Sequence, residues 1–558
     1  MFERFTRRKQ RFGEEVDVVV IGTGGAGLVA ALAAADGGAK VALLEKSQLV
    51  GGTTAVSGGV VWVPQNHHMA EVGVSDSRED ALGYLRLIAD GRTDDALLER
   101  YVDEAPKMAR WLEDKTPLRF VALGHYPDYH PEHPGGKPGG RSMETGLFQT
   151  AELGAWAKAL RRSPIFGATP MTVTEATEWG VFSKPLSLPY GELAKRYKAG
   201  YVCYGASLVG NLLAGCLAAG VEPRLGISAQ ALVQDEQGRV IGVEAVGPGE
   251  DGAALSIGAR RGVILASGGF EWDPELRRHF LGGQLTHPNS PPISHGDGLR
   301  MAMSVGADLG NMSEAWWCPS VVVPGEDYDG VQLNRGDFAI RSLPHSIIVN
   351  RAGRRFVNEA HNYNDMMKPF FDFDPVAYQR PNLPAWLVLD QAFVERYLLV
   401  TSVPGMEPPA WIPRAETLEG LAATVGIDAA GLAETVARFN GFAREGVDRD
   451  FRRGESVYDH FYGDPDHQPN PNLGTLERGP FYAIEVHPGA IGTKGGPLTT
   501  RDAQVKRPDG GVIEGLYAAG NVMAGITGPG YPGAGATIGT AMTWGWLAGR
   551  HAAARKVE

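Results

Sequence analysis

Cysteine is scarce in this chain, and a long apolar run is missing altogether. The 558 residues include three cysteines, Cys203, Cys216 and Cys318, and none of them stands in a CxxC pair. Such a set favours neither a disulfide framework nor a cysteine metal site, and it is typical of a reducing compartment. No run of 18 apolar residues occurs, and no apolar segment follows Arg7 and Arg8. We therefore expect no membrane-spanning helix, no export signal, a cytoplasmic location and no metal site.

An excess of basic residues is also absent. Lysine and arginine number 53 against 65 aspartates and glutamates, which gives a formal charge of −12. This balance argues against nucleic acid as a partner. Glycine, by contrast, is abundant, with 75 residues gathered in short loops. Such loops allow close approach of the backbone to a ligand, and the chain length predicts two or three domains.

Residues 16–45 carry the strongest local pattern. The apolar runs 16–21 and 41–44 predict two buried strands, and the Ala/Leu-rich segment 28–35 predicts a helix between them. The turn after the first strand reads GTGGAG, a GxGxxG motif at residues 22–27, and Glu45 follows Gly22 by 23 positions. In a βαβ unit these glycines admit a tight turn and a pyrophosphate, and the acid reaches a ribose hydroxyl. The stretch therefore predicts a dinucleotide-binding site.

The loop after Glu45 gives the first resemblance to a known family. It contains Gly51-Gly52-Thr53-Thr54 and then Ser57-Gly58-Gly59. Together with the βαβ unit, it resembles the FAD-binding half of the fumarate reductase/succinate dehydrogenase flavoprotein superfamily. The resemblance implies that this loop wraps the pyrophosphate and ring system of FAD. Members with covalent flavin place a histidine beside the loop, whereas His67 and His68 lie well downstream here. We therefore expect non-covalent FAD.

The resemblance implies FAD contacts at positions in the two glycine loops, after a further strand at 262–265, and near the C-terminus. These positions are Gly22, Gly24, Gly25, Ala26, Gly27, Glu45, Lys46, Gly51, Gly52, Thr53, Thr54, Ser57, Gly58, Gly59, Ala266, Ser267, Gly268, Gly520, Asn521, Ala536, Thr537 and Ile538.

The expected architecture is α/β, with a discontinuous Rossmann-like FAD-binding domain and an inserted α+β catalytic cap domain. The first domain comprises 1–324, with a β-meander at 221–246 and an insertion at about 150–200. The cap comprises 325–492, where a helical pattern covers 416–443, and the chain returns to the FAD domain at 493–558.

A C-terminal glycine loop narrows the resemblance. Fumarate reductases carry an arginine in this loop, whereas residues 531–539 read YPGAGATIG. The loop resembles that of the 3-ketosteroid Δ1-dehydrogenases, and the likeness runs from about residue 15 to 553. It extends to Tyr126-Pro127-Asp128-Tyr129-His130-Pro131-Glu132 with Pro134-Gly135-Gly136, to Arg341-Ser342-Leu343-Pro344, to Phe356-Val357-Asn358-Glu359 with Tyr363, and to Gly492-Thr493-Lys494-Gly495-Gly496.

This resemblance implies a dehydrogenation that introduces a C1–C2 double bond into 3-ketosteroids. Carried over residue by residue, Tyr531 and the Gly535 amide polarise the 3-keto group, and Tyr363 takes the C2 proton. Tyr129 is its hydrogen-bonded partner, and FAD N5 takes the C1 hydride. Tyr126 competes with Tyr129 because of their YxxY spacing, and His361 is an alternative base.

Other readings stay open. A related flavoenzyme, such as a 3-ketosteroid Δ4-dehydrogenase or a fumarate-reductase-like ene reductase acting on another cyclic ketone, is one alternative. A flavin-binding protein without turnover is another. We expect a small steroid substrate and an external electron acceptor, a quinone or similar molecule. Residues 160–171, LRRSPIFGATPM, favour either weak peripheral membrane contact or an ordinary solvated insertion. The oligomeric state does not follow from the sequence.

Overall fold

The first of two large sheets is built from both ends of the chain. The computed structural model describes residues 12–249 and 252–556. Strands of the first sheet lie in the order β21-β22-β11-β1-β2-β8, with β10 and β9 extending from β11. The pairings from β8 through β2, β1 and β11 to β22 are all parallel. The bounds are β1 Glu14–Ile21, β2 Val41–Glu45, β8 Pro223–Leu225, β9 Ser228–Gln234, β10 Val240–Val246, β11 Ala254–Leu265, β21 Gln504–Lys506 and β22 Val512–Ala518.

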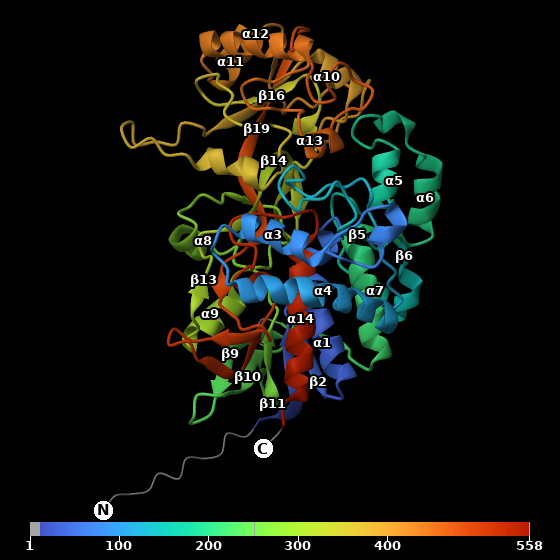
Figure 1. Ribbon diagram of the computed structural model, residues 1–558, viewed down its shortest axis with the longest axis vertical. Coiled ribbons are helices and arrows are strands. Elements are labelled where there is room, and N and C mark those ends of the chain that lie inside the picture. Colours follow the sequence, from blue (N-terminus) through green and yellow to red (C-terminus); the bar gives the residue numbers. More distant parts are fainter. Residues whose placement is uncertain (1–11, 250–251, 557–558) are drawn as a thin grey trace, which may run out of the picture.

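Helices with small residues pack closely on this sheet. Figure 1 shows α14 (Ala536–Ala554) running beside α1 (Gly25–Asp36), although the two are far apart in sequence. A Cβ at Gly545 would lie 2.3 Å from the carbonyl oxygen of Ala26, so only glycine permits this approach. The apolar helix α7 (Tyr204–Ala218) also packs on α1. The predicted βαβ unit and meander are thus confirmed.

The second sheet is mostly antiparallel and is made by the middle of the chain. Its order is β15-β14-β19-β17-β16, and β12 and β18 also pair with β19. In Figure 1 it lies in the upper part of the molecule, below α11 (Leu418–Val425) and α12 (Ala429–Glu445). Its bounds are β12 His287–Pro288, β14 Ala315–Tyr328, β15 Val331–Gly336, β16 Ser346–Val349, β17 Ala385–Leu389, β18 Arg414–Ala415 and β19 Phe481–Thr493.

Two local expectations need correction. The helical pattern at 416–443 forms two helices rather than one, because Gly426 adopts a left-handed φ of 75° and ends α11. The small-residue loop after Gly51 contains a short helix, α2 (Gly52–Val56).

The domain boundary expected near 325 falls inside β14, whereas the return expected at 493 coincides with the end of β19.

The remaining elements connect and cover the sheets. None of the described helices is long and apolar enough to cross a membrane. The helices are α3 Arg78–Ala89, α4 Asp95–Lys115, α5 Val173–Glu178, α6 Tyr190–Lys198, α8 Pro274–Phe280, α9 Asp297–Ser304, α10 Gln391–Arg396 and α13 Val457–Phe461. Short strands are β3 Val61–Trp62, β4 Val121–Ala122, β5 Ser142–Glu144, β6 Phe148–Gln149, β7 Tyr201–Val202, β13 Leu309–Gly310 and β20 Gly496–Pro497. Turns of 3-10 helix lie at Met69–Val72, Thr150–Lys158, Pro185–Ser187, Ile340–Ser342, Asp365–Phe371 and Gly520–Val522.

Candidate active site

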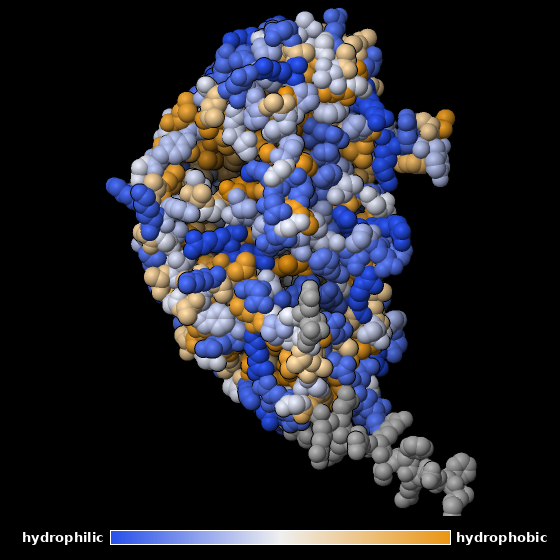
Figure 2. Space-filling view, turned by 180° about the vertical axis from the view of Figure 1, so that it is seen from behind, coloured by the Kyte–Doolittle hydropathy of each residue, from blue (hydrophilic) through white to orange (hydrophobic). Residues whose placement is uncertain are grey.

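A large cavity is lined by residues from the regions of both sheets. Its volume is about 1160 Å³, somewhat above the range of about 300–1,000 Å³ that is usual for ligand pockets. Figure 2 shows a hollow bordered by hydrophobic residues in the upper half of the molecule. All four predicted catalytic residues line the cavity, as do the predicted cofactor residues except Gly27, Gly51 and Ala536. Residues 165–190 of the predicted insertion form part of the wall, so this segment is more than a surface extension.

The glycines of the first turn have different reasons to be glycine. Gly22 has a φ of +106°, and a Cβ at Gly27 would lie 1.9 Å from the Gly22 carbonyl oxygen, so the fold itself requires both. Gly24 has an ordinary φ of −67°, and the nearest atom to an added Cβ is 3.6 Å away. The protein alone does not need glycine there. The open space at Gly24 therefore fits a pyrophosphate approaching the backbone.

Polar groups around this turn are held in place and keep room for a ligand. The Glu45 carboxylate accepts hydrogen bonds from the Thr23 amide at 3.1 Å and the Thr23 hydroxyl at 2.6 Å. It also accepts from the Ser47 amide at 2.9 Å. Because a carboxylate has about four acceptor positions, Glu45 retains capacity for a ribose hydroxyl. Lys46 is paired with Asp297 at 2.5 Å.

Three tyrosines from distant segments meet at the other end of the cavity. The ring centroids of Tyr129 and Tyr363 are 5.4 Å apart, those of Tyr129 and Tyr531 5.0 Å, and those of Tyr363 and Tyr531 5.6 Å. All three pairs pack edge to face, and each ring is buried. Trp316 of β14 lies against Tyr531, with centroids 4.7 Å apart. The structure therefore brings together the tyrosines that the resemblance singled out.

The Tyr531 hydroxyl lies where it can act with a backbone amide. It accepts a hydrogen bond from the Thr537 hydroxyl at 2.9 Å. Burial raises the pKa of Tyr531, and the Thr537 hydroxyl, the Tyr363 hydroxyl and the Gly535 amide oppose the shift. Gly535 has a φ of +89°, and a Cβ there would lie 2.2 Å from the Val60 carbonyl oxygen. The Tyr531 hydroxyl and the Gly535 amide thus lie close together at the start of α14.

The predicted hydrogen bond between Tyr129 and Tyr363 is not formed. The Tyr129 hydroxyl is buried and has no hydrogen-bond partner among the described residues. The two rings meet at 72°, edge to face, and an interaction with the Tyr129 hydroxyl opposes part of the pKa rise of Tyr363. Burial raises the pKa of Tyr363 well above its usual range. Tyr363 is therefore protonated at neutral pH unless substrate or cofactor stabilises the phenolate.

Tyr126 belongs to a second aromatic pair that sequence reasoning missed. Its hydroxyl lies 2.6 Å from that of Tyr462, and its ring stacks on Phe461 at 4.2 Å. Burial raises the pKa of Tyr462 to about 12. Tyr458 packs on Tyr129 with centroids 5.0 Å apart. The spacing of Tyr458 and Tyr462, four residues apart on a short helical segment, was the available signal. Of the two alternatives, Tyr129 is the one that packs on Tyr363.

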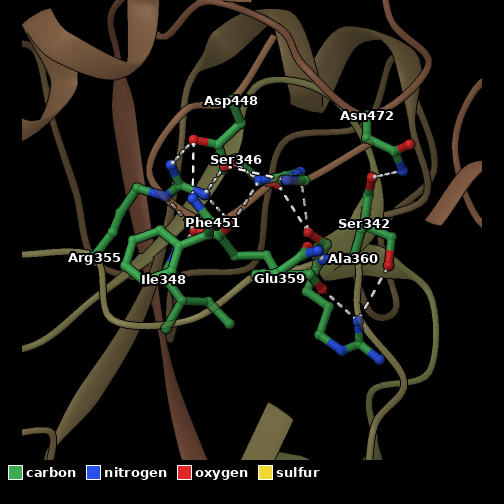
Figure 3. A network of polar contacts seen from close by, with 12 residues as sticks. Ser342, Ser346, Ile348, Arg355, Glu359, Ala360, Asp448, Phe451 and Asn472 are labelled. Carbon is green, nitrogen blue, oxygen red and sulfur yellow. Dashed lines mark hydrogen bonds and ion pairs between the residues drawn. The ribbon is translucent and has the colours of Figure 1, made fainter. Parts of the chain in front are cut away.

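A buried ionic network holds the segment that leads to Tyr363 (Figure 3). The Glu359 carboxylate accepts from Arg355 at 2.8 and 2.6 Å and from the Ile348 amide at 3.0 Å. Arg453 lies 3.3 Å from the same carboxylate, and Arg355 also pairs with Asp448 at 2.8 Å. Burial opposes ionisation of Glu359, but the two guanidiniums lower its pKa. The network fixes the backbone four residues before Tyr363.

His361, the alternative base, does not line the cavity. Its ring lies 5.2 Å from that of His130, which is paired with Asp365 at 2.7 Å. Burial lowers the pKa of His361. His130, His361 and Asp365 lie close enough together for a metal ion, as do two other groups: His67, His68 and Glu113; and His130, Glu132 and His133. The prediction of no metal site is not tested by this arrangement.

Comparison with known proteins places this chain in a family. A profile described as "FAD binding domain" matches residues 17–538. The chain is 40% identical over 562 residues to a 3-oxosteroid 1-dehydrogenase of Mycolicibacterium smegmatis, covering 96% of this chain and 97% of that protein. The chain belongs to the FAD-binding-domain flavoproteins. The predicted FAD cofactor, flavoprotein fold and resemblance are thereby confirmed.

Two further relatives bear on the substrate of this flavoprotein. The chain is 42% identical over 541 residues to a 4-oxocyclohexanecarboxylate 2-dehydrogenase of Sinomonas cyclohexanicum, covering 96% of this chain and 92% of that protein. The crystal structure of a 3-ketosteroid Δ1-dehydrogenase from Sterolibacterium denitrificans, in complex with 1,4-androstadiene-3,17-dione, has 37% identity and a TM-score of 0.89. The match covers 97% of this chain and all of that one.

Proposed function

We propose that this flavoprotein introduces a C1–C2 double bond into 3-ketosteroids. The observation that carries the proposal is the meeting of Tyr363, Tyr531 and the Gly535 amide in one apolar cavity. The same cavity reaches the glycine turn that fits FAD. The likeness to the steroid dehydrogenase structure supports the proposal over its whole length.

Each protein group has a separate task in this reaction. The Tyr531 hydroxyl and the Gly535 amide donate to the C3 ketone oxygen, which makes the C2 proton more acidic. The Tyr363 phenolate then accepts that proton. FAD, when bound, supplies the acceptor for the C1 hydride. The two electrons removed from the steroid leave to an external acceptor, such as a quinone.

Burial disfavours the deprotonated form of the proposed base, Tyr363. Because burial raises the pKa of Tyr363, the phenolate is the minor form near neutral pH. Its population grows about tenfold for each pH unit below that pKa, so turnover should rise with pH. Tyr129 packs on the base and shields it from water, but it donates no hydrogen bond in the resting structure.

A keto acid is the second candidate substrate, because the Sinomonas relative is named for one. A carboxylate in a buried site needs a cation. Among the described cavity-lining residues, every lysine and arginine is already paired with an acid. Lys46 pairs with Asp297 at 2.5 Å, Lys184 with Asp466 at 2.7 Å and Arg335 with Glu326 at 2.7 Å. This pairing favours a neutral, apolar ketone.

The test is anaerobic mixing of the purified flavoprotein with one ketone at a time. We expect bleaching of the flavin by a saturated-ring-A 3-ketosteroid, and a product with its new double bond between C1 and C2. Bleaching by 4-oxocyclohexanecarboxylate alone would favour the second candidate. A product desaturated at C4 would identify a Δ4-dehydrogenase, and no bleaching by any ketone would leave only flavin binding. An artificial electron acceptor then gives steady-state rates.

The cofactor proposal, non-covalent FAD held at Gly24, has its own test. Acid precipitation should release the flavin into the supernatant. Gly24→Ala should lower FAD content without unfolding the protein, because the added Cβ meets no protein atom closer than 3.6 Å. Gly83→Ala in α3, where a Cβ meets nothing within 4 Å, is the matched control and should keep full FAD. Equal FAD content in both variants would contradict the assignment of Gly24.

We also propose weak membrane contact through the insertion. Leu186, Tyr190 and Tyr197 expose 63%, 49% and 51% of their surfaces beside the cavity wall. One such patch gives only reversible attachment. Flotation with anionic liposomes at low salt should recover part of the protein, and a triple serine variant should not float. Absence of flotation by the unmodified protein would dispose of the idea.

A further inference from the structure

Lys494 is a buried ammonium with an unusual set of partners. It follows the end of β19 and is fully buried. Its Nζ donates to three consecutive carbonyl oxygens, those of Gly528 at 3.3 Å, Pro529 at 3.1 Å and Gly530 at 2.7 Å. The three donors of an ammonium are thus all used by one loop. Nζ also lies 4.2 Å from the centroid of the Trp316 ring.

No acid pairs directly with this ammonium among the described residues. A buried charge without a counter-ion is costly, so its other contacts must compensate it. Two carboxylates face it, but both are engaged: Glu314 with Arg92 at 2.9 Å and Lys368 at 2.7 Å, and Asp365 with His130 at 2.7 Å. The carbonyl dipoles and the face of Trp316 therefore carry the compensation.

The loop held by Lys494 leads directly into Tyr531. Its other side is wedged against the end of α3, because a Cβ at Gly528 would lie 2.4 Å from the Ala89 carbonyl oxygen. After Tyr531, the Pro532 carbonyl accepts from the Tyr84 hydroxyl at 2.6 Å and the Tyr129 amide at 2.9 Å. The Tyr531 ring itself leans on Trp316, 4.7 Å away. Lys494 thus touches both supports of Tyr531, the loop before it and the ring beneath it.

We propose that Lys494 is the positioning residue of Tyr531. Its ammonium contacts both the 528–530 carbonyls and the Trp316 ring. These contacts hold the Tyr531 hydroxyl in the position from which it donates to the ketone. The inference rests on the proposed function for the identity of that ketone, whereas the loop geometry stands by itself.

The charge state of Lys494 gives the proposal a distinctive consequence. A neutral amine has two N–H donors and a lone pair that repels a carbonyl oxygen, so it cannot hold three carbonyls. Burial lowers the pKa of Lys494 to about 7, with Lys368 adding to the shift and Glu314 and Asp365 opposing it. Ketone affinity should therefore fall as the pH rises above 7. Ionisation of Tyr363, in contrast, should raise turnover as the pH rises. Ketone affinity and turnover should therefore change in opposite directions above pH 7.

The experiment compares Lys494→Met and Lys494→Arg in the FAD-loaded protein. Affinity for 1,4-androstadiene-3,17-dione is measured from the flavin spectrum below and above pH 7, together with kcat and KM. Lys494→Met should keep FAD and lose about 10²-fold in kcat/KM with weaker ligand binding, as expected when a donor shifts by about 1 Å. Lys494→Arg remains charged at every pH, so its affinity should lose the decline above pH 7. Lys368→Met, which removes a nearby cation that does not touch the loop, is the control: it should bind normally below pH 7, and its decline should begin at higher pH because Lys368 lowers the pKa of Lys494.

Three outcomes would overturn the proposal. The first is unchanged affinity and kcat/KM in FAD-loaded Lys494→Met. The second, decisive even if Lys494→Met does not fold, is an Arg variant whose affinity declines with pH as in the unmodified protein. Amide hydrogen exchange separates this proposal from the proposed function. Faster exchange at 528–532 in Lys494→Met supports the clamp even if no ketosteroid binds, and unchanged exchange there refutes it.

Discussion

The two tyrosines proposed to act on the steroid have ring centroids 5.6 Å apart, but different kinds of contact hold them in place. Tyr363 comes from the region of the second sheet and follows a segment fixed by full charges, those of Glu359, Arg355 and Arg453. Tyr531 comes from the C-terminal loop before α14, and it is supported by neutral carbonyls gathered on a single ammonium. One support is an ionic network, and the other is a cation solvated by the backbone.

The contrast matches the chemistry proposed for each residue. A base must gain and lose a proton, so its surroundings must tolerate a change of charge. The Glu359 charge is neutralised by its two arginines, which limits the repulsion that Tyr363 would feel on ionising. A donor must stay protonated and must be aimed, which is a matter of loop position. Because the two tyrosines come from loops in distant parts of the chain, the site depends on how those parts pack together.

The largest effect is expected when the base is removed. Tyr363→Phe should lower turnover by about 10²–10⁴-fold, since loss of a general base costs that much. FAD content and product affinity should stay near normal, because the hydroxyl is assigned to neither. Steady-state rates and flavin absorbance measure this. Tyr458→Phe removes a buried hydroxyl without a partner and outside the cavity lining, so it serves as the control with near-normal turnover. Normal turnover in Tyr363→Phe would make Tyr126 the next candidate.

Removing the Tyr531 donor should lower turnover less than removing the base, but it should also weaken binding of the 3-keto product. Tyr531→Phe should lower turnover by about 10²–10³-fold, the usual loss for one preorganised donor. Affinity for the 3-keto product should fall with it, unlike in Tyr363→Phe. Titration of the flavin spectrum with product separates the two variants. If both variants bound product equally well, the division into donor and base would be wrong.

The ionic support can be broken without touching either tyrosine. Glu359→Gln leaves Arg355 and Arg453 without the carboxylate that joins them, and the buried network should lose about 3 kcal/mol of unfolding free energy. Chemical denaturation measures the loss. Glu445→Gln removes an acid from the exposed pair with Arg449 and should change stability very little. Equal stability of the two variants would show that the network does not secure the Tyr363 segment.

Local patterns made half of this site predictable. The residues from Gly22 to Gly59 lie in one stretch, and the steric need for each glycine follows from a motif a few residues long. The tyrosine end is different, because Tyr129, Tyr363 and Tyr531 are hundreds of residues apart and only the family resemblance joined them. The structure packs Tyr129 edge to face on Tyr363 and leaves its hydroxyl without a hydrogen-bond partner among the described residues. The contacts of Lys494 and Glu359 depend on tertiary packing, and no sequence spacing indicates them.

The smallest effect concerns the ion pair that ties the two tyrosine segments together. His130, next to Tyr129, pairs with Asp365, two residues after Tyr363. Burial opposes its charge, but Asp365 and Glu132 outweigh burial and raise the pKa of His130 to about 9. Because this folded-state pKa exceeds the ordinary value of 6.5, the stabilisation is complete below pH 6.5 and is lost as the pH rises through 9. The contribution is on the order of 1–3 kcal/mol.

Thermal unfolding measured across this pH range tests the pair. His361 and His133 also lie near His130, and the buried Lys494 contributes a pH dependence of the opposite sign. The comparison between variants is therefore more informative than the curve of the unmodified protein. His130→Gln should be less stable than the unmodified protein mainly below pH 6.5 and should approach its stability above pH 9. His133→Gln should be as stable as the unmodified protein at every pH. A constant difference between His130→Gln and the unmodified protein would mean that packing, not charge, joins the two segments. In that case Glu359 and its arginines would be the only ion pairs that support the Tyr363 segment through their charge.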